Sequence, residues 1–505
     1  MATIAHVPAL SVVPWQDSCD PDSPPIRRHD CTRFAPGKRL KRAQQAAFRQ
    51  AVMSAWLCLL TVGQADANAD CMNEISPITE AELSGSLDVT KPEALIAHLA
   101  KAGRAAQSVL AQMPSDARAQ ALRCAARKMR EEAGAILAAN ANDVEAALAN
   151  GLSKAMVDRL TLDGARLEGV AAAVEAVADL PDPVGVIIDK SERPNGLKLS
   201  RVRVPIGTIG IIYESRPNVT ADAAALCVRA GNAAILRGGS EAAGSNRAIL
   251  SAFTAGLAEG GVPKAAVQLV PTQDRAAVGA MLTASGLIDM IVPRGGKSLV
   301  ARVQADARVP VLAHLDGVNH TYVHSQADPA MARAIAINAK MRRTGICGAM
   351  ETLLIDVQFG DAAGLVSSLI EAGVEVRGDA RALALGPQVK PATSEDWGTE
   401  YLDAILSVAM VDGLDDALAH IAEHSSAHTD AIITDDEAAA EAFLSQVDSA
   451  IVMHNASSQF ADGGEFGLGA EIGIATGRLH ARGPVALEGL TTYKWIVRGS
   501  GQARP

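Results

Sequence analysis

Cys347 has the surroundings of a nucleophile. It stands directly before Gly348, and a small neighbour lets a substrate carbonyl approach the sulfur. Lys340, Arg342 and Arg343 precede it, and nearby positive charge lowers the pKa of a thiol and so favours the reactive thiolate. Because a lone cysteine in an alanine-rich chain is commonly a buried structural residue, these residues alone leave both interpretations open.

Two glycine-rich loops have the composition of a phosphate site. They are Arg237-Gly238-Gly239 and Arg294-Gly295-Gly296, and each follows a short apolar run. Backbone N–H groups in such a loop, at the start of a helix, favour the pyrophosphate of a dinucleotide, and an arginine beside them pairs with phosphate. Neither loop has the GxGxxG spacing, so an ordinary tight turn is an equal alternative on these residues alone.

Short apolar runs alternating with alanine-rich segments must position these residues. The pattern predicts an α/β fold with a parallel sheet covered by helices on both faces. The predicted strands are 208–213, 233–236, 267–270, 290–292, 352–356, 407–411 and 431–434, with 309–312 opening the unit that contains Cys347. The predicted helices are 221–230, 245–257 and 275–282, after a helical region over 92–178 that breaks at Pro114 with a cap at 115–116. A hairpin of strands 184–188 and 197–204, an irregular stretch over 455–483 and a last strand over 490–497 complete the prediction.

Composition narrows the class of protein. The chain has 505 residues and a net charge of −11, so nucleic acid is not an expected partner. No run of about 18 apolar residues occurs, and we expect no membrane span. The seven cysteines show no CxxC pair and no zinc spacing, which favours a reducing, cytoplasmic location and gives no metal site.

The first 71 residues differ from the rest. Their mixed Pro, Asp and Arg content predicts a disordered extension, and a natural start near Met72 is one hypothesis. Residues 51–70 imitate a signal peptide, but they lie 50 residues into the chain, where secretory signals do not normally occur.

Long motifs follow one another in a fixed order from about residue 85 to residue 502. The first, Val204–Thr220, reads VPIGTIGIIYESRPNVT, and the others cover 288–296, 338–347, 396–403, 424–430, 462–473, 479–484 and 490–494. Together they resemble the gamma-glutamyl phosphate reductase family, also called glutamate-5-semialdehyde dehydrogenases, within the aldehyde dehydrogenase superfamily.

The resemblance implies an aldehyde dehydrogenase-like fold with three parts. A Rossmann-like NADP-binding domain would comprise 85–184 and 204–311, and an α/β catalytic domain 312–485. A small oligomerisation element would comprise the hairpin at 185–203 with 486–505, so a homo-oligomer is expected.

The resemblance also implies an activity: NADPH-dependent reduction of L-glutamyl 5-phosphate to L-glutamate 5-semialdehyde and phosphate, the second step of proline biosynthesis from glutamate. Cys347 would form a thioester, and handover from a glutamate kinase is a further hypothesis. A related acylating dehydrogenase and an inactive scaffold are the alternatives.

Site residues follow from matching the motifs. Substrate-binding candidates are Arg216, Asn218, Asn338, Lys340, Arg342, Arg343 and His314. Cofactor-binding candidates are Ser215, Arg237, Gly238, Gly239, Arg294, Gly295, Gly296 and Glu400. Two positions depart from the hydrolytic relatives: His314 stands where those enzymes have a water-activating Glu, and Ser215 where they have an oxyanion-binding Asn. The groups that form the oxyanion hole are therefore not assigned, and the candidates are the Cys347 backbone N–H and Asn218 or Asn338. Whether His314 transfers a proton is also left undecided by the sequence.

Overall fold

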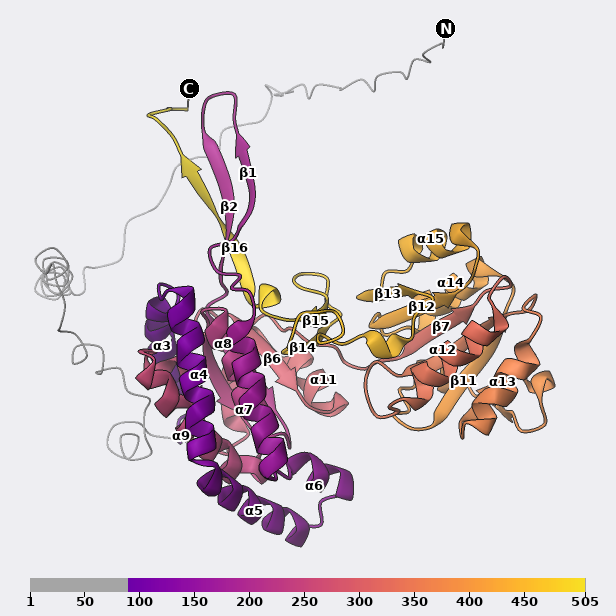
Figure 1. The fold of residues 1–505 in the computed structure, drawn as a ribbon, viewed down its shortest axis with the longest axis horizontal. Coiled ribbons are helices and arrows are strands. Elements are labelled where there is room, and N and C mark those ends of the chain that lie inside the picture. Colours follow the sequence, from indigo (N-terminus) through magenta and orange to yellow (C-terminus); the bar gives the residue numbers. More distant parts are fainter. Residues whose placement is uncertain (1–89, 505) are drawn as a thin grey trace, which may run out of the picture. The chain divides into compact units, whose positions relative to one another are not determined.

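The computed structural model describes residues 90–504, which form two parallel sheets with helices and a separate antiparallel sheet (Figure 1). The predictions made for residues 1–71 and for Met72 lie outside the described residues. Among residues 90–504, no helix combines the length and the apolar character that crossing a membrane requires.

The first parallel sheet has four strands in the order β5-β4-β3-β6. Successive residues of β3 and β4 face opposite cores: Ile211 and Leu236 pack in one, Ile212 and Ile235 in the other. Both faces are thus covered, as predicted. Its elements are β3 (Thr208–Tyr213), α8 (Val219–Arg229), β4 (Ala233–Arg237), α9 (Ala243–Glu259), β5 (Val267–Leu269), α10 (Ala276–Leu282), β6 (Met290–Arg294) and α11 (Lys297–Asp306).

The predicted helical region precedes this sheet and packs on it. Its helices are α3 (Pro92–Leu110), α4 (Ser115–Glu131), α5 (Ala133–Ala149), α6 (Lys154–Leu160) and α7 (Gly164–Asp179). The break at Pro114 is confirmed, but the predicted side-chain cap is wrong, because Ser115 is already helical and Pro114 holds the cap position.

The second parallel sheet has seven strands in the order β10-β9-β11-β8-β7-β12-β13. Its strands are β7 (Asn319–Val323), β8 (Met350–Asp356), β9 (Glu375–Gly378), β10 (Lys390–Pro391), β11 (Ile405–Val411), β12 (Thr429–Ile433) and β13 (Ile451–His454). The helices between them are α12 (Pro329–Met341), α13 (Ala362–Glu371), α14 (Leu414–His424) and α15 (Glu437–Gln446). The prediction that 309–312 opens this unit is wrong, because Val311 only forms an isolated bridge to Ile291 in the first sheet.

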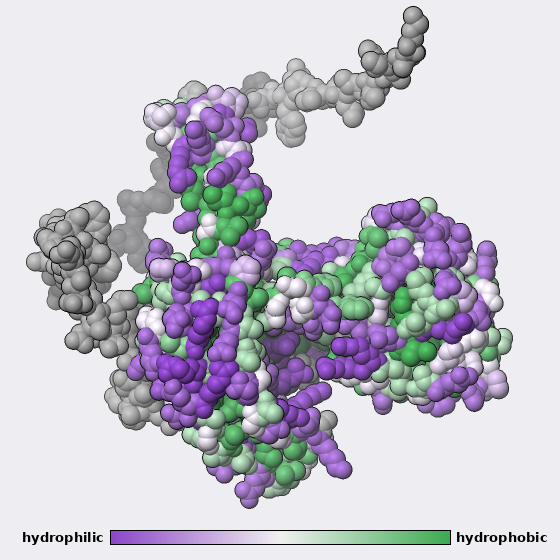
Figure 2. All heavy atoms as spheres, in the orientation of Figure 1, coloured by the Kyte–Doolittle hydropathy of each residue, from purple (hydrophilic) through white to green (hydrophobic). Residues whose placement is uncertain are grey.

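The predicted hairpin forms the antiparallel sheet with the C-terminal strand. β1 (Ile187–Glu192) pairs with β2 (Lys198–Pro205), which pairs with β16 (Thr491–Arg498); β1 begins three residues later than predicted. Apolar side chains remain exposed on it, and Figure 2 shows hydrophobic residues on its visible face. They include Val186, Ile187, Ile188, Tyr493, Trp495 and Val497.

A short hairpin returns the chain to the first sheet. β14 (Gly473–Ala475) pairs with β15 (Gly483–Val485), and both contribute residues to the core over β3 and β4. The predicted catalytic domain, 312–485, includes these residues, whereas the structure packs them on the first sheet. The chain therefore passes between the two parallel sheets twice, near 312–318 and again near 455–472.

Candidate active site

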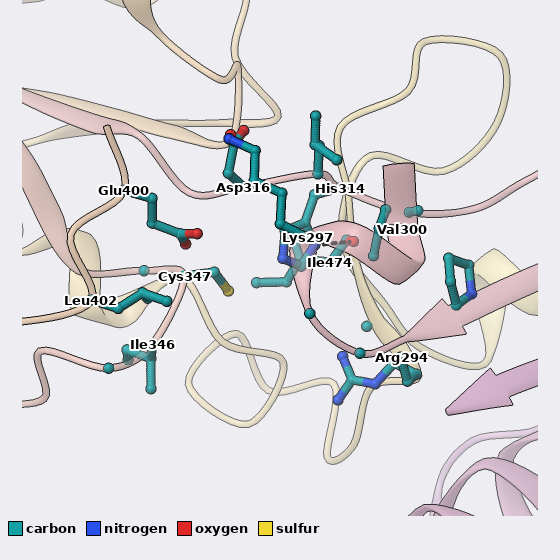
Figure 3. Close-up of a pocket in the computed structure, with 18 of the residues that line it drawn as sticks. Arg294, Lys297, Val300, His314, Asp316, Ile346, Cys347, Glu400, Leu402 and Ile474 are labelled. Atoms are coloured by element: carbon teal, nitrogen blue, oxygen red, sulfur yellow. Dashed lines mark hydrogen bonds and ion pairs between the residues drawn. The ribbon is translucent and has the colours of Figure 1, made fainter. Parts of the chain in front are cut away.

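A cleft of about 700 Å³ lies at the ends of β3 and β6 and contains Cys347 (Figure 3). In open parallel sheets, ligands bind where strands end and loops diverge, which is the position of this cleft. Most of its lining comes from the segments 214–216, 294–297, 312–316, 342–348, 400–402 and 459–474, and α6 adds Met156 and Arg159.

Backbone contacts hold the Cys347 loop in place. The side-chain amide of Asn319 donates hydrogen bonds to the carbonyl oxygens of Cys347, at 2.7 Å, and of Ala349, at 2.8 Å. Gly317 packs so closely that a β-carbon on it would lie 2.1 Å from the Cys347 carbonyl oxygen. The Gly317 N–H in turn donates to Glu400 Oε1 at 3.0 Å. The backbone of Cys347 is thus held by the residues that surround it.

We expect Gly317→Ala to lower the rate of any reaction at Cys347 about 10- to 100-fold. The added carbon must displace the Cys347 loop, and a misplaced reacting group reacts more slowly. Steady-state rates measure this, with circular dichroism to check folding. Gly360→Ala is the matched control, since nothing lies within 4 Å of the carbon it adds. Full activity of Gly317→Ala would show that the loop tolerates the displacement.

The environment of Cys347 raises the pKa of its thiol to about 11, chiefly through burial and then through the negative charges of Glu400 and Glu471. The positive charge of Arg294 opposes them. The basic residues before Cys347 predicted a lowered thiol pKa, and this prediction is wrong. Of the basic flank, Lys340 is fully buried against Glu351, and Arg342 and Arg343 are exposed.

Glu400→Gln is expected to shift the pH midpoint of Cys347 alkylation downwards, because the amide removes a negative charge that disfavours the thiolate but can still accept the Gly317 hydrogen bond. Mass spectrometry of the peptide containing Cys347, after timed iodoacetamide exposure across a pH series, gives the midpoint. Glu465→Gln, also in the cleft, serves as the control and should leave it unchanged. An equal midpoint in Glu400→Gln and the unaltered chain would refute this assignment of charge.

Two imidazoles lie beside the thiol. Ligand atoms of His314, Cys347 and His428 are all within 4.8 Å of one another, and the two rings meet edge to face at 5.1 Å. Burial lowers the pKa of His314 and lowers that of His428 to about 3, so both are neutral at pH 7. His314 Nδ1 lies 2.9 Å from the Ile474 carbonyl oxygen, which fixes the ring.

Five arginines line the cleft, and none of them has an acidic partner among residues 90–504: the exposed Arg342 and Arg343, and three from the first sheet and its helices. Arg159 from α6, Arg216 after β3 and Arg294 at the end of β6 form no ion pair with any residue in 90–504. Burial and repulsion by the other two guanidinium groups lower the pKa of Arg216, and Cys347 is close enough to oppose this. Unpaired guanidinium groups near a nucleophile are suited to bind an anionic substrate.

The substrate candidates divide into two groups. Arg216, Arg342, Arg343 and His314 line the cleft with Cys347, whereas Asn218, Asn338 and Lys340 do not. Asn218 donates to Asp222 at 2.8 Å, Asn338 is exposed on α12, and Lys340 is bound to Glu351 at 2.5 Å. The structure therefore does not support these three as substrate ligands, nor the two asparagines as an oxyanion hole.

The cofactor candidates divide similarly. Ser215, Arg294, Gly295, Gly296 and Glu400 line the cleft, whereas Arg237, Gly238 and Gly239 do not. Arg237 is buried and donates to the carbonyl oxygens of Gly238 and Gln273, so it is not available for a phosphate. The Ser215 hydroxyl and N–H both donate to Glu241 at 2.6 Å.

The loop after β6 fits a nucleotide phosphate. Gly296 caps α11, and its N–H donates to Glu214 Oε2 at 3.0 Å. A β-carbon on Gly295 would come within 2.5 Å of the same oxygen. This helix start thus already holds an anionic oxygen close to bare backbone, as phosphate binding requires.

Comparison with known proteins places the chain in a family. Residues 64–404 match the model of the aldehyde dehydrogenase family. A protein of Novosphingobium aromaticivorans named gamma-glutamyl phosphate reductase is 72% identical over 411 residues, which cover 81% of this chain and 97% of that protein. The chain belongs to the gamma-glutamyl phosphate reductase family.

Two further members of this reductase family support the assignment. The Zymomonas mobilis gamma-glutamyl phosphate reductase is 63% identical over 421 residues, covering 83% of this chain and 98% of its own. The crystal structure of the Thermotoga maritima gamma-glutamyl phosphate reductase superposes with a TM-score of 0.79 at 43% identity, covering 81% of this chain and all of that one. The resemblance seen in the motifs and the aldehyde dehydrogenase-like fold are confirmed, and the chain is an oxidoreductase of this family.

Sequence reasoning missed several residues that line the cleft or lie directly behind it. Gly317 and Asn319 are ordinary in sequence, and Arg159 lies in a short helix nearly 190 positions from Cys347. His428 and Glu471 lie inside the motifs at 424–430 and 462–473, so motif membership could have indicated them.

Proposed function

We propose that the chain catalyses NADPH-dependent reduction of L-glutamyl 5-phosphate to L-glutamate 5-semialdehyde and phosphate, the second step of proline biosynthesis from glutamate. The observation that supports this most directly is that Cys347 lines one cleft together with Arg159, Arg216 and Arg294. A thiol acts on the acyl carbon, and guanidinium groups bind the phosphate that leaves it. A relative that is 72% identical carries the name of this reductase.

The chemistry follows from these groups. The Cys347 thiolate adds to the acyl carbon, a carbon–sulfur bond forms, and the carbon–oxygen bond to phosphate breaks, which leaves a thioester. The nicotinamide cofactor, when bound, supplies the hydride that reduces the thioester carbon. The resulting oxyanion on Cys347 then expels the thiolate and releases the aldehyde, so the cysteine is regenerated.

Neutral His314 suits a route that excludes water. The residue occupies the position where hydrolytic relatives have a carboxylate that activates water, and here its ring is fixed by the Ile474 carbonyl. Phosphate, already ionised at neutral pH, needs no such base to attack the thioester in the reverse direction.

The cofactor would lie against the loop after β6. Gly295, Gly296 and the start of α11 would hold a phosphate of NADP(H), and Glu400 would face the nicotinamide ribose. Since Arg237 is committed to backbone carbonyls, the preference for NADP(H) over NAD(H) would depend on other residues.

Three further proposals concern the oligomeric state, a partner enzyme and the cellular location. The exposed apolar side chains of the β1-β2-β16 sheet would be covered by a second copy of the chain, giving a homo-oligomer. Because acyl phosphates hydrolyse readily, association with a glutamate kinase would shorten exposure to water. A cytoplasmic location fits biosynthetic chemistry that relies on a free thiol.

The reverse reaction tests the proposal. With semialdehyde and NADP+ but no phosphate, we expect at most one reduced cofactor per active site and an acyl adduct on Cys347. Adding phosphate should convert this burst into steady turnover, and coenzyme A should not replace it. Steady turnover without phosphate, or with coenzyme A instead, would reject the assignment.

Arginine variants make the same assay more specific. Arg216→Gln is expected to raise the KM for phosphate about 10- to 100-fold, since it removes one charged donor from the anion. Arg302→Gln, on α11 outside the cleft, is the control and should leave this KM unchanged. An unaltered KM in Arg216→Gln would remove that residue from the phosphate site.

A further inference from the structure

His314, Cys347 and His428 form a cluster of the side-chain types that zinc prefers. One nitrogen or sulfur from each lies within 4.8 Å of the others. Bond lengths of about 2.3 Å to sulfur and 2.0–2.1 Å to nitrogen would place these atoms roughly 3.3–3.6 Å apart around a tetrahedral ion. The three side chains therefore need to approach one another by about 1 Å to bind the ion.

Both imidazoles present a free nitrogen. Because the Ile474 carbonyl can only accept, His314 Nδ1 carries the hydrogen and Nε2 keeps its lone pair. His428 Nδ1 lies 2.9 Å from the Thr429 hydroxyl oxygen, while its Nε2 is fully buried and has no hydrogen-bond partner in the described part of the chain. A metal-binding histidine typically has this arrangement, in which an oxygen orients one ring nitrogen and the other faces the ion.

Two carboxylates near the sulfur would attract a cation, while the unpaired arginines of the cleft oppose it. Glu400 and Glu471 act electrostatically on the Cys347 sulfur, and both line the cleft. The nearby Arg294 partly offsets them. An ion at the cluster would have three protein ligands and a fourth position open to the cleft, where water can bind.

We propose that His314, Cys347 and His428 bind Zn²⁺, and that the bound ion blocks the nucleophile reversibly. Binding forms a sulfur–zinc bond and releases the thiol proton to solvent, with no change of oxidation state. Nothing in the family assignment predicts this site. The expectation of inhibition rests on the proposed function, whereas binding itself does not.

Cobalt provides a readout that is independent of activity. Titrating the full chain with Co²⁺ should produce a thiolate-to-cobalt charge-transfer band, and Zn²⁺ should displace it. Cys347→Ser should remove the band, and His428→Gln should weaken Co²⁺ binding at least about 10-fold. Cys124→Ser is the matched control, because this partly buried thiol lies on α4 outside the cleft and the variant should keep the band.

A second variant and a protection experiment separate loss of zinc binding from loss of folding. If His428→Gln does not fold, Thr429→Val removes only the oxygen that orients the ring and should weaken binding less. Zn²⁺ should also protect Cys347 from iodoacetamide, and chelation with EDTA should restore both alkylation and turnover. A band that persists in Cys347→Ser, or phosphate-dependent turnover that Zn²⁺ leaves unchanged, would overturn the proposal. A band that depends on Cys347 in a chain without phosphate-dependent turnover would instead refute the proposed function alone.

Discussion

Replacing Cys347 with serine is expected to lower reductase activity by about 10³-fold or more while leaving the fold intact. A hydroxyl is a far weaker nucleophile than a thiolate, and an ester would accept a hydride less readily than a thioester. Serine is close in size and can occupy the same partly buried position, so the loop held by Asn319 and Gly317 should be preserved. Initial rates in both directions, together with thermal unfolding, measure the two effects.

Cys124→Ser is the control for this substitution, because Cys124 lies on α4 and does not line the cleft. It should retain full activity. If Cys347→Ser also remained active, or if the acyl adduct were found on another side chain, Cys347 would not be the nucleophile.

The second large effect is on stability and concerns Lys340. Its ammonium group and the Glu351 carboxylate are both fully buried, 2.5 Å apart, and join α12 to β8. Burial lowers the pKa of Lys340 and raises that of Glu351 to about 7, while each partner's charge opposes the shift of the other. Lys340→Met leaves Glu351 buried alone, and we expect the free energy of unfolding to fall by about 3–5 kcal/mol. Urea unfolding measures this loss.

The loss of stability in Lys340→Met should depend on pH. Without Lys340, the folded-state pKa of Glu351 rises further above its unfolded value, so folding is disfavoured increasingly as the pH rises from the unfolded pKa towards the folded one. Lys340→Met should therefore be less destabilised at pH 5 than at pH 8, and adding Glu351→Leu should recover most of the loss.

Lys390→Met offers a matched comparison. Lys390 pairs with Glu375 at the same distance of 2.5 Å but is largely exposed, so its loss should cost about 1 kcal/mol or less. Equal losses for Lys340→Met and Lys390→Met would contradict the argument from burial.

Sequence reasoning succeeded where local pattern decides structure. The bounds of β3 were predicted to the residue, because its run of apolar and small residues is buried on both faces and flanked by turn residues. It missed β7, whose residues Asn319, His320 and Thr321 look unlike a buried strand. His320 is accommodated there by Asp430, and Asn319 by backbone carbonyls near Cys347. Both sets of partners come from other segments of the chain, which no local pattern can show.

The site shows the same division. The motifs identified Cys347, Arg216 and Glu400, which the structure brings into one cleft. The electrostatics could not be read from neighbours in sequence, since Lys340 faces Glu351 rather than the thiol and the nearby charges come from Glu400 and Glu471. The basic residues that precede Cys347 in sequence predicted a thiolate. The residues that surround it in space favour the protonated thiol.

The two passages of the chain between the parallel sheets have a mechanical consequence. Beside His314, the first passage is joined to the β14 segment in which the second passage ends, since the Ile474 carbonyl contacts the ring and the Thr476 N–H donates to the Ala313 carbonyl at 3.3 Å. A double connection joined by hydrogen bonds resists twisting more than a single linker would. We therefore expect movement of one parallel sheet against the other to be restricted beside His314 and Cys347.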